Sequence, residues 1–341
     1  MFEPLHTDRL VLRAPIASDV DPLHERRNEP LLAEYQGWSS PYARERAVEL
    51  VDGAVAMGGP QNDDWWMITI TDVSGAEVIG DLALHLTWEG RCAEVGYTLA
   101  SRHWGKGYAT EALNALIAWL FEEQNVTRIQ GTLHPDNIAS AMVLERTGFL
   151  FEGRTRLSYW VGEENSDDFI YAMTRTDWIE WTNRPSDRPT SIELVEVDTT
   201  NERDVGRLAT HKSQERLVAP VIYSYAHALF PEVVEGAPVV PWMRGVVAGG
   251  EYVGFVMLAL VTDHHHEPYL WRLLIDRHHQ RRGIGSMILD EIVEHCGARG
   301  WTSLVTSWEE GKGSPRPFYE RYGFEPTGEI IDGETEARIR F

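Results

Sequence analysis

The sequence has little cysteine, no long apolar run and no excess of positive charge. Cys92 and Cys296 are its two cysteines, so we expect no disulfide framework and a reducing compartment. No stretch of about 18 apolar residues occurs, as a membrane-spanning helix would need. The first residues, Met-Phe-Glu-Pro-Leu-His, lack the basic and apolar segments of a secretory signal. These absences predict a cytoplasmic protein that does not bind a membrane.

The charged residues are mostly acidic. The chain carries 53 Asp and Glu against 31 Lys and Arg, which gives a formal net charge of −22. Nucleic acid and anionic lipid would be repelled, so neither is expected as a partner. A cationic acceptor such as an amine would be attracted, although acidic surfaces mostly serve solubility. His264, His265 and His266 lack the spacing of metal ligands on a helix, so we expect no metal site.

The length of 341 residues suits two domains. Residues 182–190 read Thr-Asn-Arg-Pro-Ser-Asp-Arg-Pro-Thr, with two prolines and no large apolar side chain, as is typical of a linker. We therefore predict a first domain over residues 1–181, a linker over 182–190, and a second domain over 191–341.

Apolar periodicity predicts strands and helices in a similar order in the two halves. In the first half we expect strands at 7–13, 65–72, 77–86, 92–99, 128–133 and 169–174, and helices at 19–29, 42–57, 112–121 and 137–146. In the second half we expect strands at 192–197, 244–248, 252–260, 270–275, 303–307 and 337–341, and helices at 202–217, 221–229, 286–296 and 317–322. This mixture indicates the α/β (or α+β) class.

A basic, glycine-containing turn leads from a predicted strand into a predicted helix in each half. Residues 102–110 read Arg-His-Trp-Gly-Lys-Gly-Tyr-Ala-Thr, and residues 276–286 read Asp-Arg-His-His-Gln-Arg-Arg-Gly-Ile-Gly-Ser. The first N–H groups of a helix have no internal partner and lie at the positive end of its dipole. Glycine lets the backbone approach an anion closely. Each turn therefore predicts a phosphate-binding site.

The two halves form an internal repeat. The first glycines of the two turns, Gly105 and Gly283, are almost as far apart in sequence as the two Gly-Phe pairs at 148–149 and 323–324. Two markers at nearly the same offset, each in the same order of elements, indicate a duplicated domain.

The turns resemble the coenzyme A loop of the GNAT superfamily of acyl-CoA-dependent N-acetyltransferases, which reads Gln/Arg-x-x-Gly-x-Gly/Ala. Arg102–Gly107 and Gln280–Gly285 are aligned with it. The resemblance implies tandem GNAT folds, each a mixed, mostly antiparallel sheet flanked by helices, with acetyl-CoA as cosubstrate. It implies cofactor contacts from Arg102, Gly105, Lys106, Gly107, Tyr108, Ala109, Asn137, Leu274, Ile275, Gln280, Arg281, Arg282, Gly283, Ile284, Gly285 and Ser286.

The first half resembles the GNAT branch that acetylates the N-termini of ribosomal proteins. The matching segments are residues 7–10, 94–97, 104–112 and 137–140. The resemblance places Ser140 near the thiol or a catalytic water. Glu94 could act as a base through water, or it could be a structural hydrogen-bonding carboxylate. Because the branch also contains small-molecule enzymes, it does not fix the acceptor.

The second half resembles the branch that includes polyamine acetyltransferases, through residues 271–276, 280–285 and 318–324. In that branch the tyrosine at the position of Tyr319 donates a proton to the leaving thiolate. A phenol suits this role because its usual pKa of about 10 is close to that of a thiol. Packing beside the cofactor is the alternative role for Tyr319. Leu144 stands at the corresponding place in the first half.

These observations predict acetyl transfer from acetyl-CoA to the primary amine of a small molecule by direct attack, with the second domain as the better-equipped catalyst. The alternatives are that one domain only binds acyl-CoA or supports the fold, or that the acceptor is a peptide or protein N-terminus. Polyamines, aminoglycoside-like compounds and amino acids all remain open as acceptors. The sequence leaves the oligomeric state open and allows a monomeric pseudo-dimer.

Overall fold

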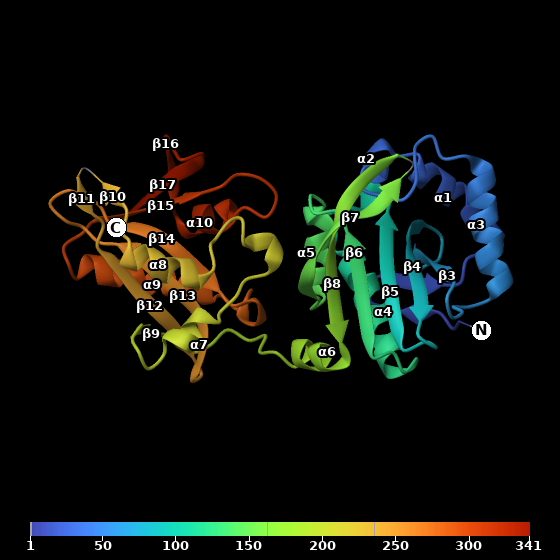
Figure 1. The fold of residues 1–341 in the computed structure, drawn as a ribbon, viewed down its shortest axis with the longest axis horizontal. Helices are drawn as coiled ribbons and strands as arrows, with labels where there is room; N and C mark the ends of the chain where they lie inside the picture. Colours follow the sequence, from blue (N-terminus) through green and yellow to red (C-terminus); the bar gives the residue numbers. More distant parts are fainter. Residues whose placement is uncertain (1, 162, 235) are drawn as a thin grey trace. The chain divides into compact units, whose positions relative to one another are not determined.

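The computed structural model describes residues 2–161, 163–234 and 236–341. It divides into two compact units, one ending at Thr182 and the other beginning at Asn183, coloured blue to green and yellow to red in Figure 1. We call them unit 1 and unit 2. Each has its own sheet, and each sheet carries helices.

The sheet of unit 1 has eight strands in the order β1-β2-β3-β4-β5-β6-β8-β7. Its neighbours are antiparallel except β5 and β6, which are parallel. The strands are β1 (Leu5–His6), β2 (Leu10–Arg13), β3 (Trp65–Asp72), β4 (Val78–Thr87), β5 (Cys92–Leu99), β6 (Arg128–Leu133), β7 (Leu150–Val161) and β8 (Glu164–Thr174). The helices are α1 (Val20–Arg27), α2 (Pro30–Ala33), α3 (Arg44–Met57), α4 (Tyr108–Glu122), α5 (Ile138–Arg146) and α6 (Arg175–Thr182).

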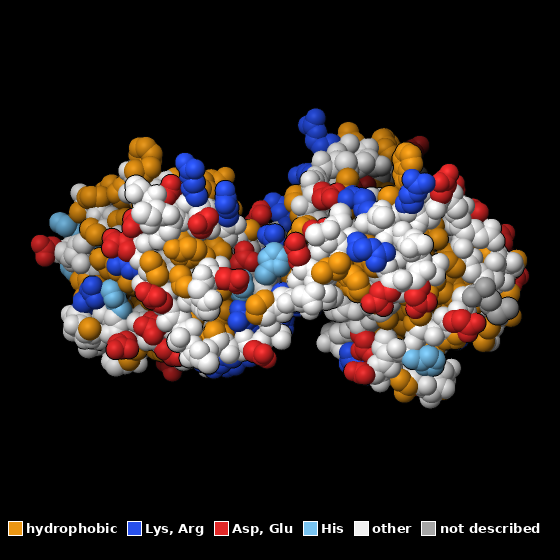
Figure 2. Space-filling view, turned by 90° about the horizontal axis from the view of Figure 1, so that it is seen from below, with side chains coloured by type: hydrophobic (Ala, Val, Ile, Leu, Met, Phe, Trp, Pro, Cys, Tyr) orange, Lys and Arg blue, Asp and Glu red, His pale blue; other side chains and the backbone are white. Residues whose placement is uncertain are grey.

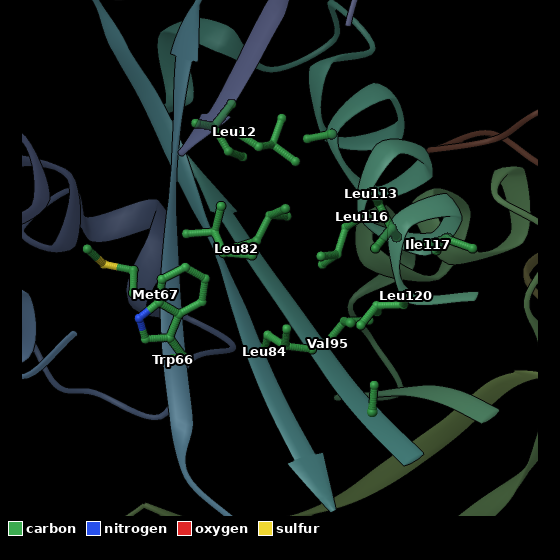
Figure 3. Close-up of a cluster of buried hydrophobic side chains, with 14 of the residues drawn as sticks. Leu12, Trp66, Met67, Leu82, Leu84, Val95, Leu113, Leu116, Ile117 and Leu120 are labelled. Carbon is green, nitrogen blue, oxygen red and sulfur yellow. The ribbon is translucent and has the colours of Figure 1, made fainter. Parts of the chain in front are cut away.

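The core of unit 1 lies where α4 packs on the sheet. Figure 3 shows side chains of the strands facing those of the helix, among them Leu82, Leu84 and Val95 opposite Leu116 and Leu120. The apolar residues of α4 recur at helical spacing, so one face is buried as the periodicity predicts. This packing fixes the start of α4, and therefore the glycine-containing turn before it, against β5.

The sheet of unit 2 has seven strands in the order β16-β17-β15-β14-β13-β12-β9, antiparallel except for β14 with β15. Its strands are β9 (Glu193–Glu196), β12 (Pro241–Ala248), β13 (Glu251–Ala259), β14 (Tyr269–Ile275), β15 (Ser303–Trp308), β16 (Glu325–Ile331) and β17 (Glu334–Arg340), and β10 (Val233–Val234) pairs with β11 (Ala237–Pro238) apart from it. The helices are α7 (Glu202–Gly206), α8 (Val221–Leu229), α9 (Ile284–Gly297) and α10 (Arg316–Tyr322).

Helix α9 packs on this second sheet as α4 does on the first. Ile284, Ile288 and Ile292 lie in one buried cluster with residues of β14 and β15. A separate cluster, which includes Phe255 and Leu274, joins the sheet to α7 and α8. The predicted fold class, a mixed and mostly antiparallel sheet flanked by helices in each half, is therefore confirmed.

One predicted helix is wrong. Residues 202–217 were expected to be helical, but α7 ends at Gly206. The chain then turns towards the segment after β14: the N–H of Ala209 donates to Asp276 Oδ2 at 3.0 Å, and the Ala209 carbonyl accepts from the N–H of Arg277 at 2.9 Å. These tertiary hydrogen bonds replace the helical ones that the local sequence favours.

Two edge strands, β7 and β16, lie where the sequence predicted none. Residues of β16 are exposed at most positions, and its run Glu-Pro-Thr-Gly-Glu-Ile-Ile shows no alternation. Such strands give no periodic signal because neither face is buried.

In the described residues, no helix combines the length and apolar character that a membrane span requires. On the face seen in Figure 2, acidic side chains are spread over the surface with Lys and Arg among them.

Candidate functional site

In each unit the two parallel strands separate part of the way along. In unit 1, β5 pairs with β6 as far as Glu94 and Gln130, although β5 continues to Leu99. In unit 2, β14 pairs with β15 as far as Leu270 and Thr306, and β14 continues to Ile275. Beyond these pairs the backbone groups that face the gap can serve an inserted ligand. The same opening in both sheets supports the predicted repeat.

The turns after these strands have the same conformation. Gly107 is the N-cap of α4 with φ 81°, and Gly283 is the N-cap of α9 with φ 75°. Two residues earlier, Gly105 and Arg281 have φ of 74° and 63°. Gly105 therefore corresponds to Arg281 rather than to Gly283. The alignment of the first glycines was wrong because an arginine adopts the left-handed conformation that glycine usually supplies.

This register changes the partner of Gln280. Its Nε2 donates to the carbonyl of Ile275, the last residue of β14, at 3.2 Å. In unit 1 Trp104 does the same: its Nε1 donates to the carbonyl of Leu99 at 2.9 Å. Trp104, and not Arg102, is the counterpart of Gln280. Arg102 instead forms an ion pair with Glu77 at 3.2 Å on the exposed side of the turn.

Arg9 covers the turn of unit 1. Its Nη1 donates to the carbonyl of Lys106 at 2.9 Å, and its guanidinium carbon lies 4.7 Å from the ring centroid of Tyr108. Glu111, in the first turn of α4, accepts from Arg9 Nε at 2.7 Å. Arg9 lies in the segment 7–10 that resembles the first GNAT branch, but the resemblance gave it no role. The contacts show that it holds the turn in place.

The turn of unit 2 is covered by a segment that the sequence analysis placed in the linker. Arg282 Nε donates to the carbonyl of Asp187 at 2.8 Å. A Cβ on Gly283 would lie 3.4 Å from Cδ of Arg188. Arg188 thus adds a cation beside the helix N-terminus. Sequence reasoning missed it, because a basic residue between two prolines resembles any solvated linker residue.

A cavity of about 1230 Å³ opens in unit 2 beside this turn. Eight of the predicted residues line it: Tyr319, Ile275, Gln280, Arg281, Gly283, Ile284, Gly285 and Ser286. Leu274, also among the predicted cofactor contacts, does not line the cavity, and its contact with a cofactor stays a prediction. It is buried against Phe255 on the opposite face of the sheet, since neighbouring residues of a strand face opposite ways. Leu273, one residue earlier, lines the cavity instead.

Tyr319 lies at the wall of this cavity and is 7% exposed. Its ring stacks on Trp308, with centroids 5.8 Å apart and planes 10° apart. Burial raises the pKa of the Tyr319 phenol well above its usual value, more than a hydrogen bond to Thr306 lowers it. The phenol is therefore protonated at neutral pH, the state that a proton donor needs.

Helix α9 approaches α10 closely at the turn. A Cβ on Gly285 would lie 3.0 Å from Cζ of Phe318, the residue before Tyr319. Gly285 therefore lets the turn and Tyr319 share one cavity.

Unit 1 brings a different set of side chains to its opening. Glu94 lies at the last parallel pair and accepts hydrogen bonds from Gln130 Nε2 at 3.3 Å and Thr132 Oγ1 at 3.1 Å. Leu270 holds the corresponding place in unit 2. Leu144, the counterpart of Tyr319, is 1% exposed in the core. Each unit thus has a polar group where the other has leucine.

Ser140 and Asn137 lie together at the start of α5. Asn137 is the N-cap, and its Oδ1 accepts from the N–H of Ser140 at 3.1 Å. The Ser140 hydroxyl lies 2.8 Å from the hydroxyl of Tyr97, whose pKa is raised by burial. Tyr97 lies in the matching segment 94–97 but was not predicted as a site residue. These contacts engage Ser140 and Asn137 in the structure of the helix end.

The cavity of unit 2 also contains polar groups that the sequence analysis did not select. Tyr269 Oη lies 2.6 Å from Ser307 Oγ, and Ser307 Oγ donates a short hydrogen bond to Glu334. Arg272, on the same strand as Tyr269, lines the cavity as well. No spacing in the sequence connects β14, β15 and β17, so only the fold brings these residues together.

Within the described part of the chain, no group of three or more His, Cys, Asp or Glu side chains is placed to hold a metal ion.

Comparison with known proteins gives matches for both units. Residues 9–150 and residues 242–326 each match a family described as an acetyltransferase (GNAT) domain. The uncharacterised N-acetyltransferase YoaA of Bacillus subtilis (strain 168) is 27% identical over 176 residues, which cover 51% of this chain and 98% of that protein. The uncharacterised N-acetyltransferase p20 of Bacillus licheniformis is 31% identical over 46% of this chain and 86% of its own length. The [ribosomal protein uS5]-alanine N-acetyltransferase of Escherichia coli (strain K12) is 32% identical over 25% of this chain and 43% of that protein.

Proposed function

The chain belongs to the GNAT family of N-acetyltransferases, and from that premise we propose that it transfers acetyl from acetyl-CoA to the primary amine of a small molecule, with unit 2 as the catalyst. GNAT acetyltransferases use acetyl-CoA, and an acyltransferase activity follows from the family. The acceptor and the choice of unit are the new parts of the proposal.

The observation that carries the choice of unit is the cavity that holds both the phosphate-binding turn and Tyr319. Backbone N–H groups at the start of α9, with Arg281 and Arg188 nearby, suit the pyrophosphate of coenzyme A. In the reaction the amine nitrogen bonds to the acetyl carbon as the carbon–sulfur bond breaks. We assign Tyr319 as the proton donor to the departing thiolate.

A second candidate role applies to unit 1, which either binds acyl-CoA without transferring the acetyl group or acts on a protein N-terminus. Leu144 leaves unit 1 without the phenol of Tyr319, while its phosphate-binding turn is intact. The similarity to the uS5-alanine acetyltransferase favours a protein N-terminus as acceptor if unit 1 is active.

Calorimetry with acetyl-CoA tests which units bind. Two sites per chain are expected, one lost in Gly283→Ala/Gly285→Ala and the other in Gly105→Ala/Gly107→Ala, with circular dichroism checking that each variant is folded. If the chain binds no acetyl-CoA at all, the proposed function fails.

Thiol release with a panel of amines tests which unit transfers. Tyr319→Phe is expected to lower kcat by about 100-fold or more with little change in the Kd for acetyl-CoA. Leu144→Phe changes the corresponding site of unit 1 and serves as the control. Full turnover by Tyr319→Phe would remove the proton-donor role and move the chemistry to another residue.

A further inference from the structure

Arg272 gives the cavity of unit 2 a positive group away from the phosphate-binding turn. It lies on β14 two residues beyond Leu270, where the parallel pairing ends, which is a distance of about 7 Å along a strand. Its Nη1 donates to the carbonyl of Trp271 at 2.7 Å, and its guanidinium carbon lies 5.9 Å from the ring centroid of Trp271.

Arg272 forms no ion pair with a described residue, although the Glu334 carboxylate acts on it through Coulombic attraction. Its Nε is buried and has no hydrogen-bond partner among residues 2–161, 163–234 and 236–341. No carboxylate in this described part of the chain lies within 4.0 Å of its guanidinium group. A buried donor that lacks a partner destabilises the protein, and an acidic ligand group beside the guanidinium group would form charge-assisted hydrogen bonds with it.

A negative group lies in the same cavity. The Tyr269 hydroxyl donates to Ser307 Oγ, and Ser307 donates to the carboxylate of Glu334. With its proton directed to Ser307, the Tyr269 oxygen can accept a hydrogen bond from a ligand. The cavity therefore offers an acceptor for an ammonium group and a donor for an acidic group.

We propose that the acceptor is an amine that carries its own acidic group, such as an α-amino acid or another short amino acid. Arg272 binds the acidic group, and the hydroxyl chain that ends at Glu334 receives the amine. A polyamine fits less well, because Arg272 would face one of its ammonium groups. This inference rests on the proposed transfer in unit 2 and names the substrate of that site.

The same chain of hydroxyls can remove the proton that the ammonium group must lose. The ammonium proton passes to the Tyr269 oxygen as the Tyr269 proton passes to Ser307 and the Ser307 proton to Glu334. The products are a neutral amine and a protonated Glu334, so charge and protons balance. Leu270 stands where unit 1 has Glu94, and Glu334 supplies from β17 the carboxylate that β14 lacks.

The test compares the twenty α-amino acids, their carboxamides and the amines that remain after decarboxylation, with thiol release as the readout. For the best amino acid, kcat/KM is expected to exceed that of its amide by at least 10-fold. Arg272→Gln is expected to remove this preference through a 10-fold to 100-fold rise in the acceptor KM. The Kd for acetyl-CoA should stay unchanged.

Arg244→Gln is the matched control. Like Arg272, Arg244 donates from Nη1 to the carbonyl of the residue before it at 2.7 Å and lies over a tryptophan, 4.4 Å from the centroid of Trp242. It comes from β12 and lies outside the lining described for the cavity. The preference for acidic amines should survive in this variant.

Turnover of amides or polyamines in preference to amino acids would overturn the inference and leave the proposed transfer intact. An unchanged preference in Arg272→Gln would do the same. If no amine is turned over, calorimetry with the amino acids in the presence of coenzyme A decides. Binding that Arg272→Gln abolishes supports the inference, and no binding rejects it.

Discussion

Asp276 shows how a single carboxylate holds the glycine-containing turn of unit 2 in place. Its Oδ1 accepts from the N–H of His278 at 3.0 Å and lies 3.1 Å from His278 Nδ1, while Oδ2 accepts from the N–H of Ala209. Burial alone would raise the pKa of Asp276, but these hydrogen bonds outweigh it and lower the pKa to about 2. The ionised carboxylate therefore favours the folded state.

The pH dependence of stability follows from this sign. A pKa lowered from 3.8 to about 2 contributes about 2 kcal/mol of stability above pH 4, which is lost as the pH falls from 4 towards 2. Asp276→Asn should lack this component. Urea unfolding of both proteins should give a difference in free energy that shrinks by about 2 kcal/mol over this range. A difference that stays constant with pH would contradict the role of the ionised carboxylate.

At the level of single residues, the sequence predicted some of the side chains that line the cavity and missed others. Tyr319 and Gly285 both line the cavity, and the catalytic role of the first and the cofactor contact of the second stay predictions. Arg272 lay in the matching segment 271–276 without a role, and Glu334 was interpreted as surface because only the fold brings β17 to the cavity. The alignment of the two turns was wrong at Arg281 because its identity gives no sign of the positive φ that it adopts. The side chain of Leu274 is buried away from the cavity, so a cofactor contact from Leu274 would have to come from its backbone.

At the level of strands, a glycine lets the neighbouring strand pass close to the opening in each sheet. Gly80 of β4 lies opposite Leu99, and Gly254 of β13 lies opposite Ile275, the last residues of β5 and β14. A Cβ on Gly80 would lie 2.4 Å from the carbonyl oxygen of Thr98, and one on Gly254 would lie 2.7 Å from that of Leu274. Both contacts are with backbone, so the strands would have to shift.

Gly80→Ala should therefore lower the free energy of unfolding of unit 1 by about 1–3 kcal/mol. Gly96→Ala is the control in the same pair of strands, because its added Cβ would meet Ala83 Cβ at 3.6 Å, an ordinary contact. Urea unfolding measures both variants. Equal effects of the two substitutions would mean that the close approach to Thr98 is not what requires glycine.

The segment around Arg188 lies against the turn of unit 2. Arg188→Ala removes a cation next to Gly283, where a phosphate group would bind. The affinity of unit 2 for acetyl-CoA should fall by about 3-fold to 10-fold, and the salt dependence of binding should weaken. Arg203→Ala is a control, since Arg203 is an exposed arginine of α7 paired only loosely with Glu202 at 3.7 Å. Calorimetry at two salt concentrations separates the outcomes, and an unchanged Kd would exclude Arg188 from the site.

Elements with at least one buried face were the ones that the sequence predicted. The strands 65–72, 92–99 and 128–133 coincide with β3, β5 and β6, and helix 221–229 coincides with α8. The prediction of a helix beyond Gly206 was wrong because the N–H of Ala209 donates to Asp276, a residue too distant in sequence for any local pattern to indicate. The edge strands β7 and β16 failed because exposure removes the alternation that marks a strand.

At the scale of the whole molecule, the two units have separate apolar cores. Thermal unfolding is therefore expected to show two transitions that respond to different substitutions. Asp81→Asn breaks the buried ion pair with Arg26 and should lower the transition of unit 1, since stranding a buried charge costs about 3–5 kcal/mol. Ile292→Ala should lower the free energy of unfolding of unit 2 by about 2–5 kcal/mol, and with it the temperature of that unit's transition. Calorimetry that gives one transition moved by both substitutions would contradict separate unfolding.

The contacts of Asp187 and Arg188 with Arg282 and Gly283 decide where the chain can be divided. If the chain is cut after residue 190, the second half begins at its first predicted strand but loses Arg188 and the Asp187 carbonyl, which contact its glycine-containing turn. Cut between Thr182 and Asn183, it would keep them. Separate expression, domain exchange or fusion to another acetyltransferase should therefore divide the chain between Thr182 and Asn183. Residues 183–190 form no helix or strand, but they include the two residues that contact the turn of unit 2.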